Sequence, residues 1–150
     1  DFSFSPTRPD GGPAANAVAA GKRPRSSMAP VIVLDRQGRL VGAVGSPGGP
    51  SILAYNAKAL IAVLDWGLPM QAAIGLPNLV ARRDGFGADT DRFSEALRQG
   101  LAERGVILSP NASENSGLHG GIWRRGPDGW GWDGGADDRR EGVARTGIRE

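Results

Sequence analysis

The chain has 150 residues, which is the size of one domain and long enough to bury a substantial core. Its 18 basic and 16 acidic residues leave a net charge of +2, too small an excess to indicate a nucleic-acid partner. The sequence has no Cys, which excludes disulfides and thiolate metal sites, and its single His argues against a His-rich metal site. We therefore expect no metal or cofactor, and the longest apolar stretch, residues 57–64, is far too short to span a membrane.

The first part of the sequence is its least regular part. Residues 1–25 carry repeated Pro and Gly without a sustained hydrophobic period, which predicts an extended surface loop. A loop of this length in a compact domain is usually functional or flexible. Asp1, taken alone, would be a solvated terminal carboxylate. Because neither an initiator Met nor a signal peptide is present, we expect a processed or cut fragment.

Residues 22–53 organise the rest of the chain through alternating strand and turn signals. Two β-branched apolar runs, at 31–34 and 40–44, flank a Gly-containing turn at 36–39, which predicts a β-hairpin. A turn rich in Gly and Pro follows. The sequence from 51 to 66 then carries only two charged residues, which predicts a helix that is buried on most sides.

The turn before this helix has the composition of an anion-binding site. Gly48 and Gly49 have no side chains, so their backbone N–H groups can approach a negative oxygen beside a helix N-terminus, as in an oxyanion hole. Pro50 suits the first helical position because its missing N–H would be unpaired there, and Gly49 would be the cap. Upstream, Ser26 and Ser27 provide adjacent hydroxyls that either satisfy turn backbone groups or bind a carboxylate.

The remaining segments predict a mixed order of helices and strands, so the fold class is α+β. In chain order we expect a short helix at 70–75, a strand at 79–83, a loop through Gly85 and Gly87, an amphipathic helix at 90–104 and a strand at 106–108.

The C-terminal part predicts a second hairpin and a charged tail. Strands at 118–124 and 130–133 flank a turn at 126–129 that has suitable Gly, Pro and Asp residues. The alternating charges of residues 137–150 predict a solvated tail. We expect packing across the strands, rather than stacking on a sugar or a base, for the three tryptophans of this region, Trp123, Trp130 and Trp132.

Two other kinds of chemistry receive little support from the sequence. A Ser-His-Asp triad could be assembled from Ser46, His119 and Asp133, because a triad is defined by geometry and not by sequence distance. However, Pro47 removes the N–H that would follow the nucleophile, and the surrounding residues do not form a nucleophile elbow. A phosphate-binding loop is not supported either, because no Lys-Ser or Lys-Thr follows the glycines.

Several segments together resemble one family. The run GKRPRSSMAP, then GSPGG, then GGADDRREGVA, with Asp1-Phe2-Ser3 at the start, resembles the C-terminal part of the small subunit of gamma-glutamyltransferases. That family belongs to the N-terminal-nucleophile hydrolases, in which a precursor cuts itself and a new N-terminal Thr becomes the nucleophile. The resemblance implies a partial αββα four-layer sandwich with an open sheet edge, and a nucleophile upstream of Asp1 that this chain lacks.

The resemblance also implies roles for individual residues. Asp1 would hold the α-ammonium group of a gamma-glutamyl substrate, Ser26 and Ser27 its α-carboxylate, and Gly48 and Gly49 the oxyanion. The implied activity is transfer or hydrolysis of gamma-glutamyl groups of glutathione-like donors. The implied partners are the large subunit and the upstream part of the small subunit of the same precursor. The isolated chain would be inactive, and the location would be periplasmic or secreted.

Other interpretations stay open at this point. The chain could be a non-catalytic fragment or binding module, or part of a related glutaryl or cephalosporin acylase. Ala29 and Val31 stand where the family usually has Ser and Thr, and Pro50 and Asp138 are also atypical. These departures leave the choice between glutamyl and glutaryl substrates undecided.

Overall fold

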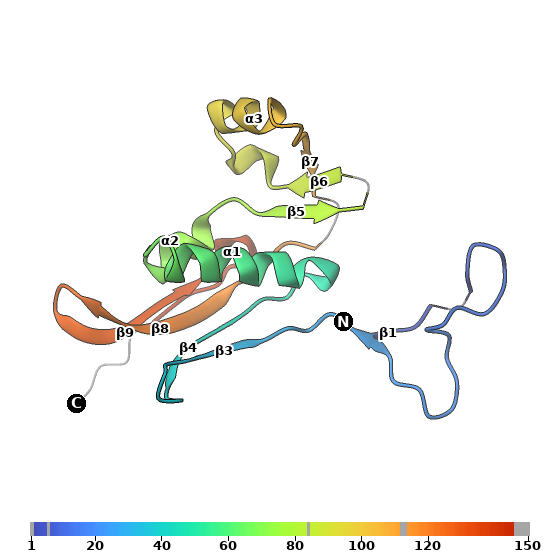
Figure 1. The fold of residues 1–150 in the computed structure, drawn as a ribbon, viewed down its shortest axis with the longest axis horizontal. Coiled ribbons are helices and arrows are strands. Elements are labelled where there is room, and N and C mark those ends of the chain that lie inside the picture. The colour runs from blue at the N-terminus through green and yellow to red at the C-terminus, as the bar shows by residue number, and fades with distance from the viewer. Residues whose placement is uncertain (1, 6, 84, 112–113, 146–150) are drawn as a thin grey trace.

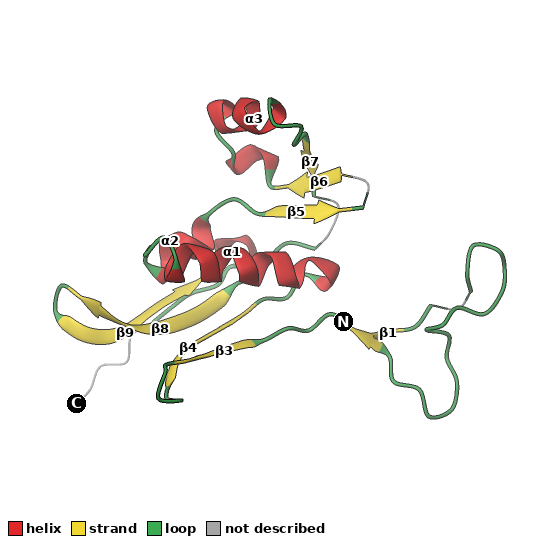
Figure 2. Ribbon diagram, viewed as in Figure 1, coloured by secondary structure: helices red, strands yellow, loops and turns green. Residues whose placement is uncertain are grey.

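A computed structural model describes residues 2–5, 7–83, 85–111 and 114–145 (Figure 1). A four-stranded antiparallel sheet, in the order β3-β4-β8-β9, carries helices α1 and α2 on one face (Figure 2). A three-stranded sheet, β5-β6-β7, and a two-stranded one, β1-β2, complete the mixed α+β fold. The strands are β1 (Phe2–Ser3), β2 (Arg25–Ser26), β3 (Val31–Leu34), β4 (Leu40–Gly45), β5 (Leu79–Arg82), β6 (Gly85–Ala88), β7 (Leu108–Pro110), β8 (His119–Gly126) and β9 (Gly129–Ala136). The α-helices are α1 (Ile52–Leu64), α2 (Met70–Gly75) and α3 (Glu95–Ala102).

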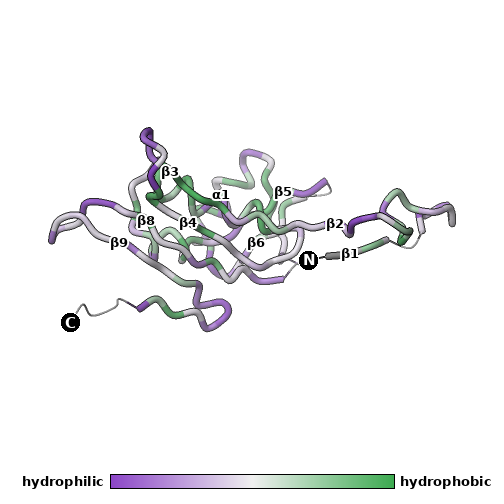
Figure 3. Tube along the Cα trace, turned by 90° about the horizontal axis from the view of Figure 1, so that it is seen from below, coloured by the Kyte–Doolittle hydropathy of each residue, from purple (hydrophilic) through white to green (hydrophobic). Residues whose placement is uncertain are grey.

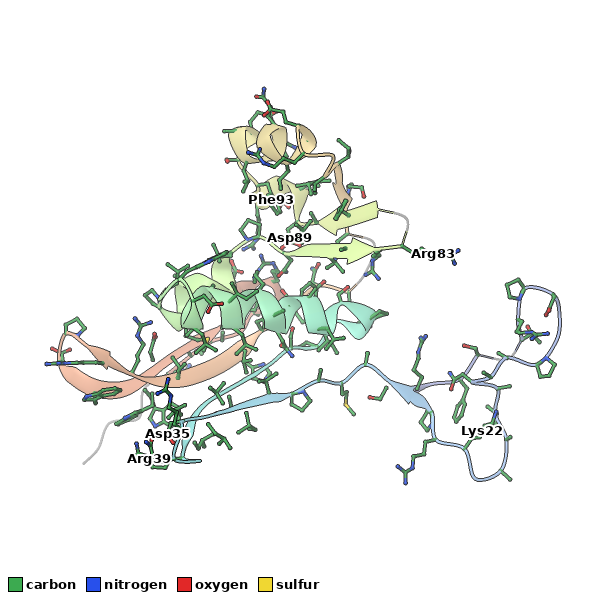
Figure 4. All side chains as sticks on the ribbon, in the orientation of Figure 1. Lys22, Asp35, Arg39, Arg83, Asp89 and Phe93 are labelled. Atoms are coloured by element: carbon green, nitrogen blue, oxygen red, sulfur yellow. The ribbon has the colours of Figure 1, made fainter. Side chains whose placement is uncertain are left out.

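The predicted hairpin at residues 31–44 is confirmed. Strands β3 and β4 pair antiparallel, with Val31 opposite Val44. Asp35 organises the turn because its carboxylate accepts hydrogen bonds from the backbone N–H groups of Gln37 and Arg39 and from the Arg39 side chain (Figure 4). The backbone hydrogen bond from Arg39 is the main reason that the pKa of Asp35 is lower than usual.

The first helix begins through a single 3₁₀ turn, Gly49–Ser51, before α1 proper. Pro50 lies in the first turn, as predicted, but the cap is Gly48 and not Gly49. The buried face of α1 packs against β4, β5 and α2, and the main core gathers between this helix layer and the sheet. The hydrophobic stretches of β3, β4 and α1 lie together in Figure 3.

The region between α2 and β8 differs from the prediction at three places. The expected loop through Gly85 and Gly87 is strand β6, which pairs antiparallel with β5 and parallel with β7. Strand β7 lies two residues later than predicted. Helix α3 is shorter than the expected 90–104, because Phe93 is extended and Ser94 caps the helix by accepting a hydrogen bond from the N–H of Leu97.

Strands β8 and β9 form a long hairpin that reaches beyond the ends of the helices (Figure 1). Both strands are longer than predicted, but the turn between them is at the expected place. Trp123 and Trp132 lie directly opposite each other with their rings in an edge-to-face arrangement, 5.7 Å between centroids. For this pair, the predicted packing across the strands is confirmed.

The second face of the four-stranded sheet is not covered by any helix in the described part of the chain (Figure 2). Side chains alternate along a strand, so Val31 and Val33 face the helices while Ile32 and Leu34 face outward and are exposed. Trp132, on β9, is exposed as well. We call this side of the sheet the open face.

The prediction of a solvated tail from residue 137 is wrong for its first part. The side chains of Asp137 and Arg139 are buried, and the Arg139 guanidinium contacts the carboxylates of Asp137 and Asp89 at 3.0 and 2.8 Å (Figure 4 labels Asp89). The same guanidinium donates to the carbonyls of Ile74 and Leu76 at the end of α2. Burial by itself would raise the pKa of Asp137, but hydrogen bonds from Ser116 and Arg139 lower it below its usual value.

Candidate functional site

A cavity of about 410 Å³ lies where β4 ends and α1 begins. Its floor is the turn from Gly45 to Gly49, and Ile52 of α1 contributes to it. One wall is the segment from Met28 to Pro30, which leads into β3. The opposite wall contains His119, the first residue of β8, and Glu114, in the segment before that strand. These residues meet because β4 lies between β3 and β8 in the sheet, with Gly45 directly opposite His119.

The predicted glycine pair lies on the floor of this cavity, in a conformation that favours glycine. Gly48 has φ 138° and Gly49 has φ 53°, both in the region that L side chains rarely adopt. Among the described residues, neither amide N–H donates a hydrogen bond, whereas the Gly48 carbonyl accepts from the N–H of Ser51. The two amides are therefore available to an oxygen atom at the start of a buried helix.

The other predicted site residues lie at the edge of the cavity or outside the described residues. Asp1 is outside them, but its neighbour Phe2 pairs with Ser26 between β1 and β2. Ser26 is exposed, and its hydroxyl accepts a hydrogen bond from the N–H of Met28, so it satisfies a backbone group of the turn. Ser27 is half-buried. Neither serine lines the cavity, although the next residue, Met28, does.

The alternative triad is not assembled. The hydroxyl of Ser46 donates to the Pro47 carbonyl and accepts from the N–H of Gly117. Asp133 accepts hydrogen bonds from the N–H of Met70 and from Arg124. His119 and Asp133 also face opposite sides of the sheet, because Ile122, three residues after His119, is the residue that pairs with Asp133.

Helix α1 holds both walls of the cavity through two residues for which the sequence predicted no functional role. The Tyr55 hydroxyl donates to the Glu114 carbonyl at 2.9 Å on one side. The Asn56 amide donates to the Ala29 carbonyl at 2.6 Å on the other. Both residues are buried, and both carry polar groups on a helix that is apolar apart from them and Lys58. Polar residues on the buried side of an apolar helix were the signal that could have identified them, because buried polar groups need hydrogen-bond partners.

Charges around the cavity are paired. The carboxylate of Glu114 lies 3.0 Å from the Arg140 guanidinium, which also donates to the Asn115 carbonyl. His119 is held through its Nδ1, which lies 3.0 Å from the Gly117 carbonyl, so this nitrogen carries the proton. In the described ranges no three His, Cys, Asp or Glu residues are grouped so that they could hold a metal ion. The described helices include none with the length and apolar character needed to cross a membrane.

Known proteins share this sequence pattern. The chain matches the family model of gamma-glutamyltranspeptidase over residues 1–147. It is 36% identical over 115 residues to the glutathione hydrolase proenzyme of Escherichia coli (strain K12), an alignment that covers 68% of this chain and 20% of that protein. It is 31% identical over 142 residues to the acylase ACY 1 proenzyme of Pseudomonas sp. (strain SE83), covering 89% of this chain and 24% of that protein. The chain thus spans about a quarter or less of these relatives.

Solved structures share the fold. A mutant gamma-glutamyltranspeptidase of Helicobacter pylori superposes with a TM-score of 0.74 at 26% identity, over 93% of this chain and 77% of that one. Cephalosporin acylase from Bacillus halodurans gives a TM-score of 0.67 at 25% identity, over 89% of this chain and 25% of that one. The fold is that of the N-terminal-nucleophile hydrolases, as the resemblance implied. With the family match extending over almost its whole length, this chain belongs to the gamma-glutamyltranspeptidase family.

Proposed function

We propose that the chain forms part of an enzyme that transfers or hydrolyses gamma-glutamyl groups, and that its cavity binds the reacting carbonyl. The observation that carries this proposal is the pair of glycine amides on the cavity floor, which have no acceptor among the described residues. The family match and the similarity to glutathione hydrolases support the choice of substrate class.

In this proposal the amides of Gly48 and Gly49 stabilise a tetrahedral intermediate. A Thr hydroxyl from another part of the complete protein attacks the gamma-carbonyl carbon, and the carbonyl oxygen becomes an anion that accepts both N–H groups. The intermediate then expels the amine, which takes up the proton lost by the hydroxyl. Water or a second amine releases the acyl group in the reverse sequence of steps. Each backbone donor to the oxyanion contributes about 3 kcal/mol of transition-state stabilisation.

The substrate's amino-acid head would be bound at the rim of the cavity. We assign its α-ammonium group to Asp1 and its α-carboxylate to Ser26 and Ser27. The pairing of Phe2 with Ser26, which brings the N-terminal strand beside the serines, is consistent with this assignment. Carboxylate and hydroxyl groups suit a zwitterion of this kind, because one accepts from the cation and the others donate to the anion.

A glutaryl or cephalosporin acylase is the second candidate. The acylase ACY 1 proenzyme is similar over more of this chain than the Escherichia coli enzyme is, 89% against 68%. A glutaryl group has no α-ammonium, so it would not use a carboxylate at the position assigned to Asp1. The two candidates therefore differ in one charged contact.

The remainder of the same precursor would cover the open face. Ile32, Leu34 and Trp132 are exposed there, although one apolar face of a sheet is normally packed against another layer. The relatives are proenzymes of which this chain spans about a quarter or less. We infer that the upstream part of the small subunit supplies the missing layer and the Thr nucleophile.

Amine release from a gamma-glutamyl anilide and from the matching glutaryl anilide by the complete protein tests the proposal. We expect release from the gamma-glutamyl compound at a rate at least tenfold higher, and none from the isolated 150-residue chain. Mass spectrometry of the processed protein should find a new N-terminal Thr. Preference for the glutaryl compound would support the acylase, and release by the isolated chain would show that the nucleophile lies within it.

A further inference from the structure

Tyr55 lies directly beneath the cavity floor. Its side chain is buried, with 1% of its surface exposed, and its ring packs against Gly48. A Cβ atom added to Gly48 would lie 2.5 Å from Tyr55 Cε2 and 2.9 Å from Cδ2, so the ring occupies the space that any side chain at residue 48 would need. Tyr55 is on the first full turn of α1, seven residues after Gly48.

The hydroxyl of the same side chain holds the cavity wall. It donates to the Glu114 carbonyl at 2.9 Å and accepts from the Asn111 amide at 2.8 Å. Glu114 lines the cavity, so one rigid side chain joins the floor at Gly48 to the wall at Glu114. An aromatic ring suits this task because it is flat, incompressible and limited to few rotamers.

We propose that Tyr55 is a positioning residue for the oxyanion-binding amide of Gly48. The ring supports the backbone of Gly48, which lines the cavity at φ 138°, and the hydroxyl sets the distance between floor and wall. The expected effect on turnover rests on the proposed function, whereas the support of the Gly48 backbone by the ring does not. Because the oxyanion forms only in the transition state, the ring should influence kcat, whereas the hydroxyl should influence the fit of the bound substrate.

Two substitutions in the complete protein separate these effects. Tyr55→Leu removes the ring edge beneath Gly48 together with the hydroxyl. We expect kcat with gamma-glutamyl anilide to fall by roughly tenfold to a hundredfold, while KM rises by about the same factor as in Tyr55→Phe, because both variants lack the hydroxyl. Tyr55→Phe keeps the ring, and we expect kcat to stay within about threefold of wild type while KM rises. Equal losses of kcat in the two variants would overturn the assignment to the ring.

Val63→Ala is the matched control for lost packing. Val63 is buried on the same helix and does not line the cavity, so this variant should lose thermal stability without a comparable loss of kcat. If kcat falls equally in Val63→Ala and Tyr55→Leu at similar losses of Tm, the role of Tyr55 is only structural and the proposal is wrong.

A double variant tests the contact itself. Gly48→Ala should clash with the ring, so combining it with Tyr55→Leu should give a kcat roughly tenfold above the product of the two single effects. Strictly multiplicative effects would contradict a direct contact. A complete protein without gamma-glutamyl activity would refute the proposed function but not the role of Tyr55. Crystal structures of wild type and Tyr55→Leu would then still show whether the ring determines the backbone conformation of Gly48. Retention of the Gly48 backbone conformation after ring removal would overturn the inference.

Discussion

Two Arg–Asp pairs with the same spacing lie near opposite ends of the chain in opposite environments. In the N-terminal loop, Arg8 and Asp10 approach to 2.9 Å, and their side chains are 58% and 62% exposed. Near the other end, Asp137 and Arg139 approach to 3.0 Å, with side chains 0% and 5% exposed. The first pair is bound mainly within its own loop, whereas the second joins β9 to α2 and to Asp89.

The difference teaches that burial of a charged pair depends on its distant partners. Asp137 accepts hydrogen bonds from Ser116, from the N–H of Leu118 and from Arg139. Arg139 in turn satisfies Asp89 and two helix-terminal carbonyls. The buried carboxylate and the buried guanidinium thereby both gain several partners, which is the condition for burying a charge without a prohibitive cost. An exposed pair has no such set of partners, and it contributes little to the free energy of unfolding.

Asp137→Asn should have the largest effect. It removes the charge opposite a buried guanidinium, so we expect a loss of about 3 kcal/mol of unfolding free energy in the complete protein at pH 7. The folded-state pKa of Asp137 is lowered, so its contribution is present above the ordinary pKa of Asp and is lost as pH falls through the folded value. Denaturant unfolding at a series of pH values should show a larger acid-dependent loss in wild type than in the variant, which keeps only the contribution of other carboxylates such as Asp35. The same loss in both proteins would contradict the prediction.

Arg139→Lys should cost less, about 2 kcal/mol, because the charge remains but the planar fork that reaches two carboxylates and two carbonyls does not. Thermal unfolding of the variant measures this cost. Arg92→Lys is the control, since the Arg92–Asp138 pair is more exposed and contacts fewer elements. If the two variants lose the same stability, the burial of Arg139 does not account for its effect.

Lys58, which lies near Arg139, provides a third test with a smaller expected effect. Its Nζ donates to the carbonyls of Ile74 and Leu76, and burial, together with the charge of Arg139, lowers its pKa from 10.5 to about 8. The unfolded chain keeps the proton up to higher pH, so stability should rise by about 1 kcal/mol between pH 7 and 9. Denaturant unfolding across this range should show the rise in wild type and not in Lys58→Met.

Asp10→Asn should have the smallest effect. The Arg8–Asp10 pair is exposed, so we expect the unfolding free energy to change by no more than about 0.5 kcal/mol. The measurement is again denaturant unfolding, at low and at moderate salt. A loss comparable with that of Asp137→Asn would remove the distinction between the two pairs.

Local signals predicted the local structure. The hairpin of β3 and β4 follows from apolar runs around a Gly-containing turn, and α1 follows from a largely apolar stretch after Pro50. Strand β6 was missed because its residues, Gly85 to Ala88, have low strand propensity, and its parallel partner β7 comes after α3. The burial of Asp137 was missed because Ser116 and Asp89 are far away in sequence.

The same limit applies to the candidate site. Gly48 and Gly49 could be chosen from the sequence, because a Gly-Gly pair before a buried helix is a local feature, and the family resemblance directed attention to them. Tyr55 could not be connected to Glu114, which is 59 positions away. Which amides are free, and which side chains fix them, depends on contacts that exist only in the folded chain.

The arrangement around Asp137 also bears on protein engineering. The N–H of Gly142 donates to the Asp137 carbonyl, and a Cβ on Gly142 would lie 2.7 Å from that oxygen. A side chain at residue 142, or a label attached to it, would therefore push against the fold. Residues 143–145, which are exposed, give a more tolerant attachment point.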